Sequence, residues 1–362
     1  MAAEIKKLLG CANIGQLAKH IVEAQAMSSF GTSGNYSCAV EDIKFFVKIA
    51  LYTFLSYDLW KKPGGSKSPV VDAEINIFRA IKTKIIDRGY SPHFIEILAI
   101  SRCTGVRDFI LDKEKCTQML LGHANNDKRP QSLLCAFASY LDTGMAQDQF
   151  AIIFSEFCEF NIKEYIMRYA PLFPSERDLM IQAIIFQIYY TLEVAQRVWP
   201  RFRHGDLYVH NIMIKLAHDG AKYLNHRHYL RYKMDNREWN IPFFGFFVKI
   251  IDFGHSEIPE EGVISSVRKP SDLWLPDHAT FIMSFEGIII ESLFMTDELR
   301  AFFGTLNYQH LLPGVAHIYV MRLLKSFATP ISAIQTNFGA FETAINEELV
   351  IKEYTAPPKR ND

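Results

Sequence analysis

The sequence lacks the features of disulfide-rich, zinc-binding and strongly charged proteins. Its six cysteines form no CxxC pair and no regular spacing, which argues against a disulfide framework or a structural zinc site. Reduced thiols in a cytoplasmic compartment are the simplest expectation. The 39 basic residues nearly balance the 40 acidic ones, for a net charge of −1. The charge therefore predicts neither nucleic acid nor an anionic membrane as a partner.

Long apolar runs are also absent. The most apolar stretch, Phe281 to Phe294, is shorter than the about 20 residues that span a bilayer, and it contains Glu286 and Glu291. No membrane span is therefore expected. With 362 residues, of which 49% are hydrophobic, the chain can bury one large core or two modest ones.

Two acidic loops next to apolar strands carry the strongest chemical signal. HGDLYVHN occupies residues 204–211, and VKIIDFG ends at Gly254. Phosphoryl transfer from ATP needs a carboxylate that orients the acceptor hydroxyl, and oxygen ligands for Mg²⁺. Asp206 is the candidate for the first role and Asn211 is a candidate metal ligand. Asp252 emerges from an apolar strand into a glycine turn, where a metal-binding carboxylate can be held firmly.

These residues resemble the catalytic loop and the DFG motif of the protein-kinase-like superfamily, over roughly residues 28–330. The resemblance implies an α+β, bilobal protein-kinase-like fold. The N-terminal lobe, 28–155, would hold a small antiparallel β-sheet with one main helix. The C-terminal lobe, 156–350, would be mainly helical, and ATP and Mg²⁺ would bind between the two lobes.

Other segments complete the expected organisation. Apolar residues at helical spacing predict a helical extension over residues 1–27. Polar, irregular composition predicts an insertion at about 101–147. A second insertion, at about 216–247, is rich in tyrosine, histidine and asparagine and includes a tyrosine-rich strand and a polar turn. A helix is predicted to begin near Ser175. The polar tail, 351–362, is expected to be disordered because it has little to bury.

The kinase pattern also implies a lysine that contacts the α- and β-phosphates and a helix-borne glutamate that holds it. Lys48 lies inside the apolar run IKFFVKIAL. A buried lysine is costly unless it is paired. Glu74 lies at the edge of the apolar face of the following helix, so it is the predicted partner and orienting residue.

The nucleotide-covering loop and the adenine-contacting segment are weaker matches. Gly31 and Gly34 match part of the glycine-rich pattern, and they are the candidates for the loop over the phosphates. The segment IIFSEFCEF resembles the strand and hinge that contact adenine, with backbone groups from Glu156 to Cys158 as candidates.

The resemblance is incomplete in the catalytic loop. Gly205 stands where most protein kinases have arginine, so control by a phosphate paired with that arginine is not expected. Tyr208 replaces a lysine that contacts the transferring phosphate, and His210 is a candidate to substitute for it. Asp277 is the expected anchor of the loop, and His204 is expected to pack near the DFG turn.

The sequence leaves three classes of function to weigh. HGDL followed by IDFG is also the signature of small-molecule kinases that resemble aminoglycoside and choline phosphotransferases. The stretch 229–254 instead resembles the insert before DFG in divergent serine/threonine protein kinases of large DNA viruses, which favours a protein substrate. The third class is a pseudokinase that acts as a binding scaffold. The presence of four expected site residues counts against it: Lys48, Asp206, Asn211 and Asp252.

The viral resemblance has further implications. ATP and Mg²⁺ are the implied cofactors, and a protein is the implied substrate. A viral kinase would act in the cytoplasm of the infected cell, and packaging into virus particles stays open.

Overall fold

The computed structural model describes residues 21–24, 33–53, 70–105, 140–144, 146–172, 174–218, 228–264, 277–292, 294–305, 338, 341–342 and 345–359. Contacts divide the chain into two compact units, each described here by itself. Unit 1 comprises Met1–Arg79, Glu96–Phe157 and Val263–Val267, and unit 2 comprises Ala80–Ile95, Cys158–Gly262 and Arg268–Asp362.

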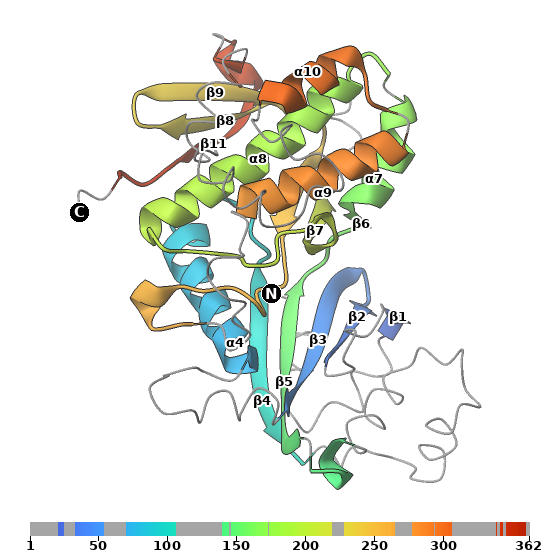
Figure 1. Ribbon diagram of the computed structural model, residues 1–362, viewed down its shortest axis with the longest axis vertical. Helices are drawn as coiled ribbons and strands as arrows, with labels where there is room; N and C mark the ends of the chain where they lie inside the picture. The colour runs from blue at the N-terminus through green and yellow to red at the C-terminus, as the bar shows by residue number, and fades with distance from the viewer. Residues whose placement is uncertain are drawn as a thin grey trace, which may run out of the picture. The chain divides into compact units, whose positions relative to one another are not determined.

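Unit 1 contains a five-stranded antiparallel sheet in the order β1-β2-β3-β5-β4 (Figure 1). Phe45, Val47 and Ile49 of β3 are buried on one face of this sheet. Because successive side chains of a strand point to opposite faces, Lys48 lies on the other face. The strands are β1 (Ile21–Ala24), β2 (Ser33–Val40), β3 (Ile43–Thr53), β4 (Ile97–Thr104) and β5 (Ala146–Glu156).

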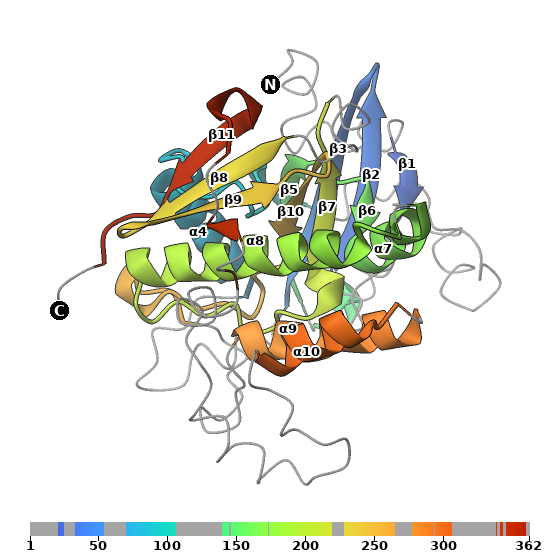
Figure 2. The same cartoon turned by 90° about the horizontal axis from the view of Figure 1, so that it is seen from above.

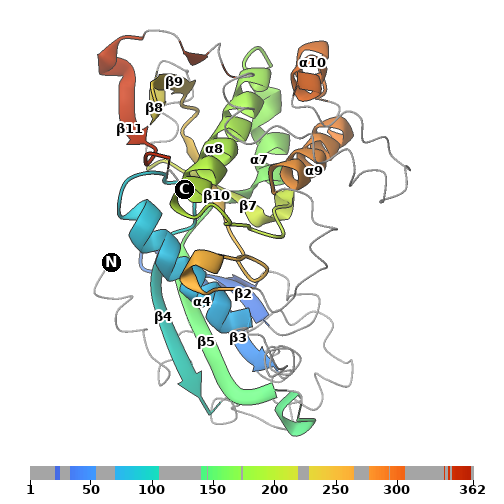
Figure 3. The same cartoon turned by 60° about the vertical axis from the view of Figure 1, so that its left-hand side comes forward.

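Helix α4 (Val70–Ile81) lies beside β4 and β5 (Figure 3). Its apolar residues at helical spacing are buried, as the sequence predicts: Val71, Ile75, Phe78 and Ile81. Polar contacts also join the helix to the sheet, since the Tyr52 hydroxyl donates to Asp72 at 2.8 Å. The periodic apolar face therefore fixes which side of α4 meets the sheet.

Unit 2 combines helices with two small sheets. The helices are α7 (Ile162–Tyr169), α8 (Arg177–Val198), α9 (Asp277–Glu291) and α10 (Asp297–Thr305). One sheet has the order β10-β7-β6, from Phe246–Ile250, Ile212–Leu216 and Phe160–Asn161. The other has the order β11-β8-β9, from Val350–Thr355, Tyr229–Met234 and Arg237–Pro242.

Helix α8 forms the centre of unit 2, beside the β11-β8-β9 sheet (Figure 2). It is buried on nearly all sides, as expected of a helix that is apolar all round. The antiparallel sheet of unit 1 and the helices of unit 2 confirm the α+β fold class. In the parts of the chain that the structure describes, no helix has the length and apolar character to cross a membrane.

Two predicted boundaries are wrong, and a third is met. Ile21–Ala24 form strand β1 rather than part of a helix, because they pair with β2, while the rest of the predicted 1–27 helix lies outside the described residues. The predicted insertion at 101–147 includes the end of β4 and the start of β5. Helix α8 begins at Arg177, which agrees with the predicted start near Ser175, although its N-cap Glu176 makes no side-chain capping bond.

Both the 216–247 insertion and the C-terminal tail of unit 2 contain strands, and only the tail is more ordered than predicted. Within the predicted insertion at 216–247, β8 and β9 form an antiparallel hairpin. The tail predicted to be disordered, 351–362, contains most of β11, which pairs in parallel with β8. Tyr354 is only 3% exposed, so the tail does have an apolar anchor to bury.

One cysteine also departs from the expectation of reduced thiols. Cys103 in β4 is disulfide-bonded, and its partner lies outside the described residues. Cys38 and Cys158 are buried thiols that form no disulfide. Burial raises the pKa of the Cys38 thiol to about 12, so this side chain stays protonated and unreactive at neutral pH.

The buried side chain of His93 should make the folded protein less stable in acid. Burial lowers the pKa of His93 from 6.5 to about 3, and the charge of Lys249 adds to the effect. The unfolded chain therefore binds one more proton than the folded chain between these values, and stability falls as pH falls through that window. Between pH 7 and pH 4 the loss from this residue is about 3 kcal/mol.

The measurement is the free energy of urea unfolding at pH 7, 5 and 4 for the wild type and His93→Gln. We expect the variant to be less stable at pH 7 but to lose less on acidification, because glutamine takes up no proton. Equal losses in the two proteins would contradict the assignment of this pH dependence to His93.

Candidate functional site

The pairing of β7 with β10 brings the two acidic loops of unit 2 together. These strands are antiparallel, with Ile250 opposite Ile212. One residue further on, the Ile251 amide donates to the carbonyl of Asn211 at 3.0 Å. The residue that precedes Asp252 is therefore bonded directly to the end of the 204–211 loop. The loop that ends at Asn211 and the turn that contains Asp252 therefore lie next to each other.

Asn211 also determines the position of Asp206. Its side-chain Nδ2 donates to the Asp206 carbonyl at 2.7 Å and to the Asp206 carboxylate Oδ2 at 3.0 Å. Asn211 is 3% exposed, whereas the Asp206 side chain keeps 27% of its surface exposed. A buried amide thus holds a carboxylate that solvent, or a substrate, can reach.

His204, at the start of the 204–211 loop, contacts the segment around Asp252. Its Nε2–H donates to the Ile251 carbonyl at 2.9 Å, and its ring centroid lies 5.1 Å from that of Phe253. Burial lowers the pKa of His204, against the opposing charge of Asp277, so the ring is neutral. His204 is fully buried, which confirms the prediction that it packs near the DFG turn.

Asp277, the first residue of α9, anchors the 204–211 loop as predicted. Its two carboxylate oxygens accept the amides of His204 and Gly205 at 2.7 and 2.9 Å. On the other side of the loop, the Ser256 hydroxyl donates to the His204 carbonyl at 2.7 Å. The backbone next to Asp206 is thus held by side chains from two separate segments.

We expect Asp277→Ala to loosen the 204–211 loop and, for the phosphotransfer activity proposed below, to lower the rate about 10- to 100-fold, because two backbone amides lose a charged acceptor, worth about 1.5–3 kcal/mol each. Asp277→Asn keeps one acceptor oxygen and should show a smaller loss. The measurements are kcat/KM and hydrogen exchange at the amides of His204 and Gly205. Wild-type exchange and activity in Asp277→Ala would contradict the anchoring role.

Two residues of these loops have left-handed backbone conformations. Asp252 has φ of 61° and Gly205 has φ of 78°. Non-glycine residues rarely adopt such values, although aspartate and asparagine tolerate them best. Asp252 is exposed between a half-buried Ile251 and a fully buried Phe253. The left-handed backbone at Asp252 therefore turns its carboxylate out of an otherwise buried strand end. The left-handed backbone at position 205 explains why glycine occupies it.

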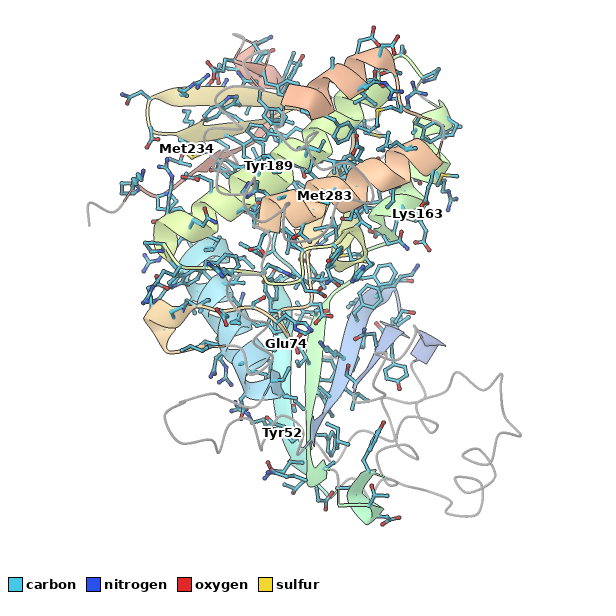
Figure 4. The ribbon with its side chains drawn as sticks, in the orientation of Figure 1. Tyr52, Glu74, Lys163, Tyr189, Met234 and Met283 are labelled. Atoms are coloured by element: carbon cyan, nitrogen blue, oxygen red, sulfur yellow. The ribbon has the colours of Figure 1, made fainter. Side chains whose placement is uncertain are left out.

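The predicted pair in unit 1 is formed. Lys48 Nζ lies 2.7 Å from Glu74 Oε1, and the side chains are 20% and 3% exposed. Glu74 lies on the side of α4 that faces the sheet (Figure 4). A nearly buried carboxylate next to an ammonium fits the expectation that a lysine in an apolar strand needs a partner.

The other residues predicted to contact the nucleotide are Gly31, Gly34 and the backbone from Glu156 to Cys158. Gly34 lies inside β2, opposite Ile49, rather than in a loop, and Gly31 lies outside the described residues. The Glu156 amide donates to the Glu96 carbonyl, and the Glu156 carboxylate accepts the Glu96 amide. The Glu156 N–H is therefore already used within the sheet. Cys158 is 1% exposed, and the role of its backbone groups in binding adenine stays a prediction.

Tyr208 and His210 are the exposed side chains next to Asp206. Their rings stack with centroids 5.7 Å apart, and His210 Nε2 lies 3.9 Å from Asp206 Oδ2. The structure thus brings His210 to the carboxylate that the sequence assigns to the acceptor. Its role as a substitute for the usual lysine stays a prediction.

The donor set fits Mg²⁺ bound together with a nucleotide rather than a closed protein cage. Among the described residues, no group of three or more His, Cys, Asp and Glu could hold a metal ion. Mg²⁺ in nucleotide sites typically takes one or two protein oxygens and the phosphates. Asn211 turns its Nδ2 to Asp206, which leaves its Oδ1 for another partner, and Asp252 supplies a carboxylate.

The sequence did not identify every residue that shapes this site. Ser256 holds the catalytic loop, and Lys249 donates to the carbonyl of Pro92 at 2.7 Å just before the DFG turn. Ser256 carries no recognisable signal in isolation. Lys249 does, because a lysine between Val248 and Ile250 in an apolar strand needs a buried acceptor, as Lys48 does.

Two curated proteins and one solved structure are similar to this chain. No family model matches the sequence. Two curated proteins of Acanthamoeba polyphaga mimivirus, each named "Putative serine/threonine-protein kinase", are similar to it. One is 26% identical over 278 residues, covering 70% of this chain and 64% of the relative. The other is 23% identical over 252 residues, covering 67% of this chain and 49% of the relative.

This chain thus matches less than two thirds of the length of either relative. Among solved structures, WaaP in complex with acyl carrier protein aligns with a TM-score of 0.39 and 10% identity, over 95% of this chain and 98% of that chain.

Proposed function

We propose that this chain, which is similar to proteins named as serine/threonine kinases of a large DNA virus, transfers the γ-phosphate of ATP to serine or threonine hydroxyls of a protein. The observation that carries the proposal is Asn211, which bonds both the Asp206 carboxylate and the residue before Asp252. The side-chain amide of Asn211 holds the candidate acceptor-binding carboxylate, and its main-chain carbonyl accepts the amide of Ile251, the residue before the candidate metal-binding carboxylate.

The proposed roles in unit 2 follow from exposure and hydrogen bonding. Asp206 accepts a hydrogen bond from the acceptor hydroxyl and so orients its oxygen towards the γ-phosphate. Asn211 Oδ1 and the Asp252 carboxylate would hold Mg²⁺, which neutralises phosphate charge when bound. Asp277 and Ser256 keep the loop backbone in place, so that little reorganisation is needed during transfer.

The proposed role in unit 1 belongs to Lys48. Its ammonium would contact the α- and β-phosphates, and Glu74 would keep the side chain extended along the sheet. The remaining exposure of Lys48, 20% of its side chain, is compatible with a further contact. The glycine positions 31 and 34 and the backbone from Glu156 to Cys158 stay as weaker proposals for nucleotide contacts.

A protein acceptor is preferred to a small molecule because of the β8-β9 hairpin. The stretch 229–254, which resembles the viral kinase insert, forms this hairpin and then β10. The curated relatives are also named as protein kinases. We therefore keep the small-molecule kinase and the pseudokinase scaffold as outcomes of the test.

The test is incubation of the purified chain with Mg²⁺ and ATP labelled at the γ-phosphate. Basic proteins, acidic proteins, aminoglycosides and amino alcohols are offered in parallel. We expect label on serine or threonine of a protein, identified by mass spectrometry. Label on an amino alcohol or aminoglycoside would favour the small-molecule kinase. Mg²⁺-dependent ATP binding without any labelled acceptor would favour the scaffold.

A further inference from the structure

The C-terminal strand is attached to unit 2 by charge as well as by backbone pairing. Strand β11 runs parallel to β8, with Tyr354 opposite Tyr232. Arg231 of β8 makes a two-pronged contact with Glu347 at 2.6 and 2.8 Å. Lys233 of the same strand lies 2.8 Å from Glu353. The two basic side chains of β8 thus pair with Glu347, just before β11, and with Glu353 inside it, and these pairs favour the observed register of β11 against β8.

The residues after β11 are also held. The Ala356 amide donates to the Lys233 carbonyl at 2.8 Å, and the Pro357 carbonyl accepts Arg197 Nη1 at 3.2 Å. The Arg197 side chain is only 3% exposed and also binds Asp235 at 2.7 Å. A buried arginine of α8 therefore joins the hairpin turn and the tail, so the tail is part of the folded unit.

A chain of contacts runs from the tail to a buried histidine. The Tyr354 ring stacks on Tyr232 with centroids 5.4 Å apart, and its centroid lies 6.2 Å from that of His93. The Tyr232 hydroxyl donates to His93 Nε2 at 2.8 Å, and His93 Nδ1–H donates to the Val248 carbonyl at 3.1 Å. Both nitrogens of His93 are thus used, which fixes its ring.

The same histidine lies against the strand that ends at Asp252. The Ile250 amide donates to the His93 carbonyl at 2.7 Å, and the Ile95 amide donates to the Ile250 carbonyl at 3.0 Å. Lys249 adds the bond to Pro92 described above. Strand β10 is therefore held along one edge by residues 92–95, and Asp252 follows two residues after Ile250.

We propose that Tyr354 is a positioning residue for Asp252. By packing on Tyr232 and His93, it fixes the 92–95 segment and so the strand end from which the Asp252 carboxylate projects. The inference rests on the proposed function for its consequence in catalysis. A tail that merely covered apolar surface would bury Tyr354 equally well, but it would leave strand β10 unchanged on removal of the ring.

The test compares three full-length variants. Tyr354→Leu keeps apolar bulk but removes the planar ring, Tyr354→Phe keeps the ring, and Ile351→Ala changes an exposed residue of the same strand, which is 38% exposed. Hydrogen exchange is measured at the amides of Ile250 and Ile251, with amides of α8 as reporters of global folding. Mg²⁺-dependent ATP binding and phosphotransfer are measured in parallel.

For Tyr354→Leu we expect exchange at Ile250 and Ile251 to rise about tenfold, with α8 unchanged. The Mg²⁺ concentration for half-maximal ATP binding should rise at least about threefold, and kcat should fall about tenfold while KM for the acceptor changes little. Tyr354→Phe and Ile351→Ala should behave as the wild type.

Unchanged exchange at Ile250 and Ile251 in Tyr354→Leu would overturn the inference, whatever the activity. A rise that is equally large in α8 would also overturn it, because Tyr354 would then support unit 2 as a whole. If the wild type transfers no phosphate, the proposed function fails, while the exchange and Mg²⁺ measurements still decide the role of Tyr354.

Discussion

Asp206→Asn is expected to reduce phosphotransfer by at least about 10²- to 10⁴-fold, the range for loss of a positioned acid–base group. Asparagine has nearly the same shape and can still accept the bond from Asn211 Nδ2. The loop should therefore keep its conformation, and only the charge that orients the acceptor hydroxyl is lost. Nucleotide binding should be unchanged.

The measurement is a single-turnover assay with labelled ATP, together with ATP binding by calorimetry. Asp87→Asn is the matched control, since Asp87 is an exposed carboxylate of unit 2 that pairs with Lys82 at 3.1 Å. Exposed pairs contribute little to stability, so this variant should transfer phosphate normally. Wild-type rates in Asp206→Asn would exclude Asp206 from the mechanism.

Asp252→Asn is expected to abolish the Mg²⁺-dependent part of ATP binding and to lower transfer at least about 100-fold, as loss of a charged metal ligand requires. The backbone determines the choice of variant. At φ of 61°, asparagine is tolerated almost as well as aspartate, whereas alanine would add strain. Asp252→Gly removes the carboxylate with no conformational cost, so the two variants should lose Mg²⁺ dependence alike.

The measurement is the Kd for ATP with Mg²⁺ and with EDTA. In the wild type, Mg²⁺ should tighten binding, and in both variants the two values should coincide. If Asp252→Asn keeps the wild-type response to Mg²⁺ while Asp252→Gly loses it, an uncharged oxygen is sufficient at this position. If both variants keep it, the metal is held by other residues.

The sequence predicted those parts of the site in which a residue needs a particular partner, or in which the order of strands places it. Lys48 inside an apolar strand requires an anion, and Glu74 on the next helix is in reach. Asp206 precedes β7 and Asp252 follows β10, and the pairing of these two strands brings the loops together. Such arguments need only burial cost and the order of elements, both of which a sequence displays.

The parts that failed depend on pairing between distant segments. Strand β11 contains charged residues and reads as a solvated tail, and it becomes ordered only because Arg231 and Tyr232 lie opposite it. β-propensity depends on such neighbours more than on the strand itself. The same reason explains β1, whose four residues are fixed by β2, and no local signal marks Cys103 as disulfide-bonded.

The left-handed Gly205 restricts how this loop could evolve. In L-residues, a side chain at such φ values costs about 1–2 kcal/mol, and the Gly205 amide is already bonded to Asp277. A single codon change to arginine would therefore strain the backbone that carries Asp206 before any benefit arose. Any larger side chain at position 205 would therefore be accommodated only if the backbone between His204 and Asp206 shifted away from its bonds to Asp277.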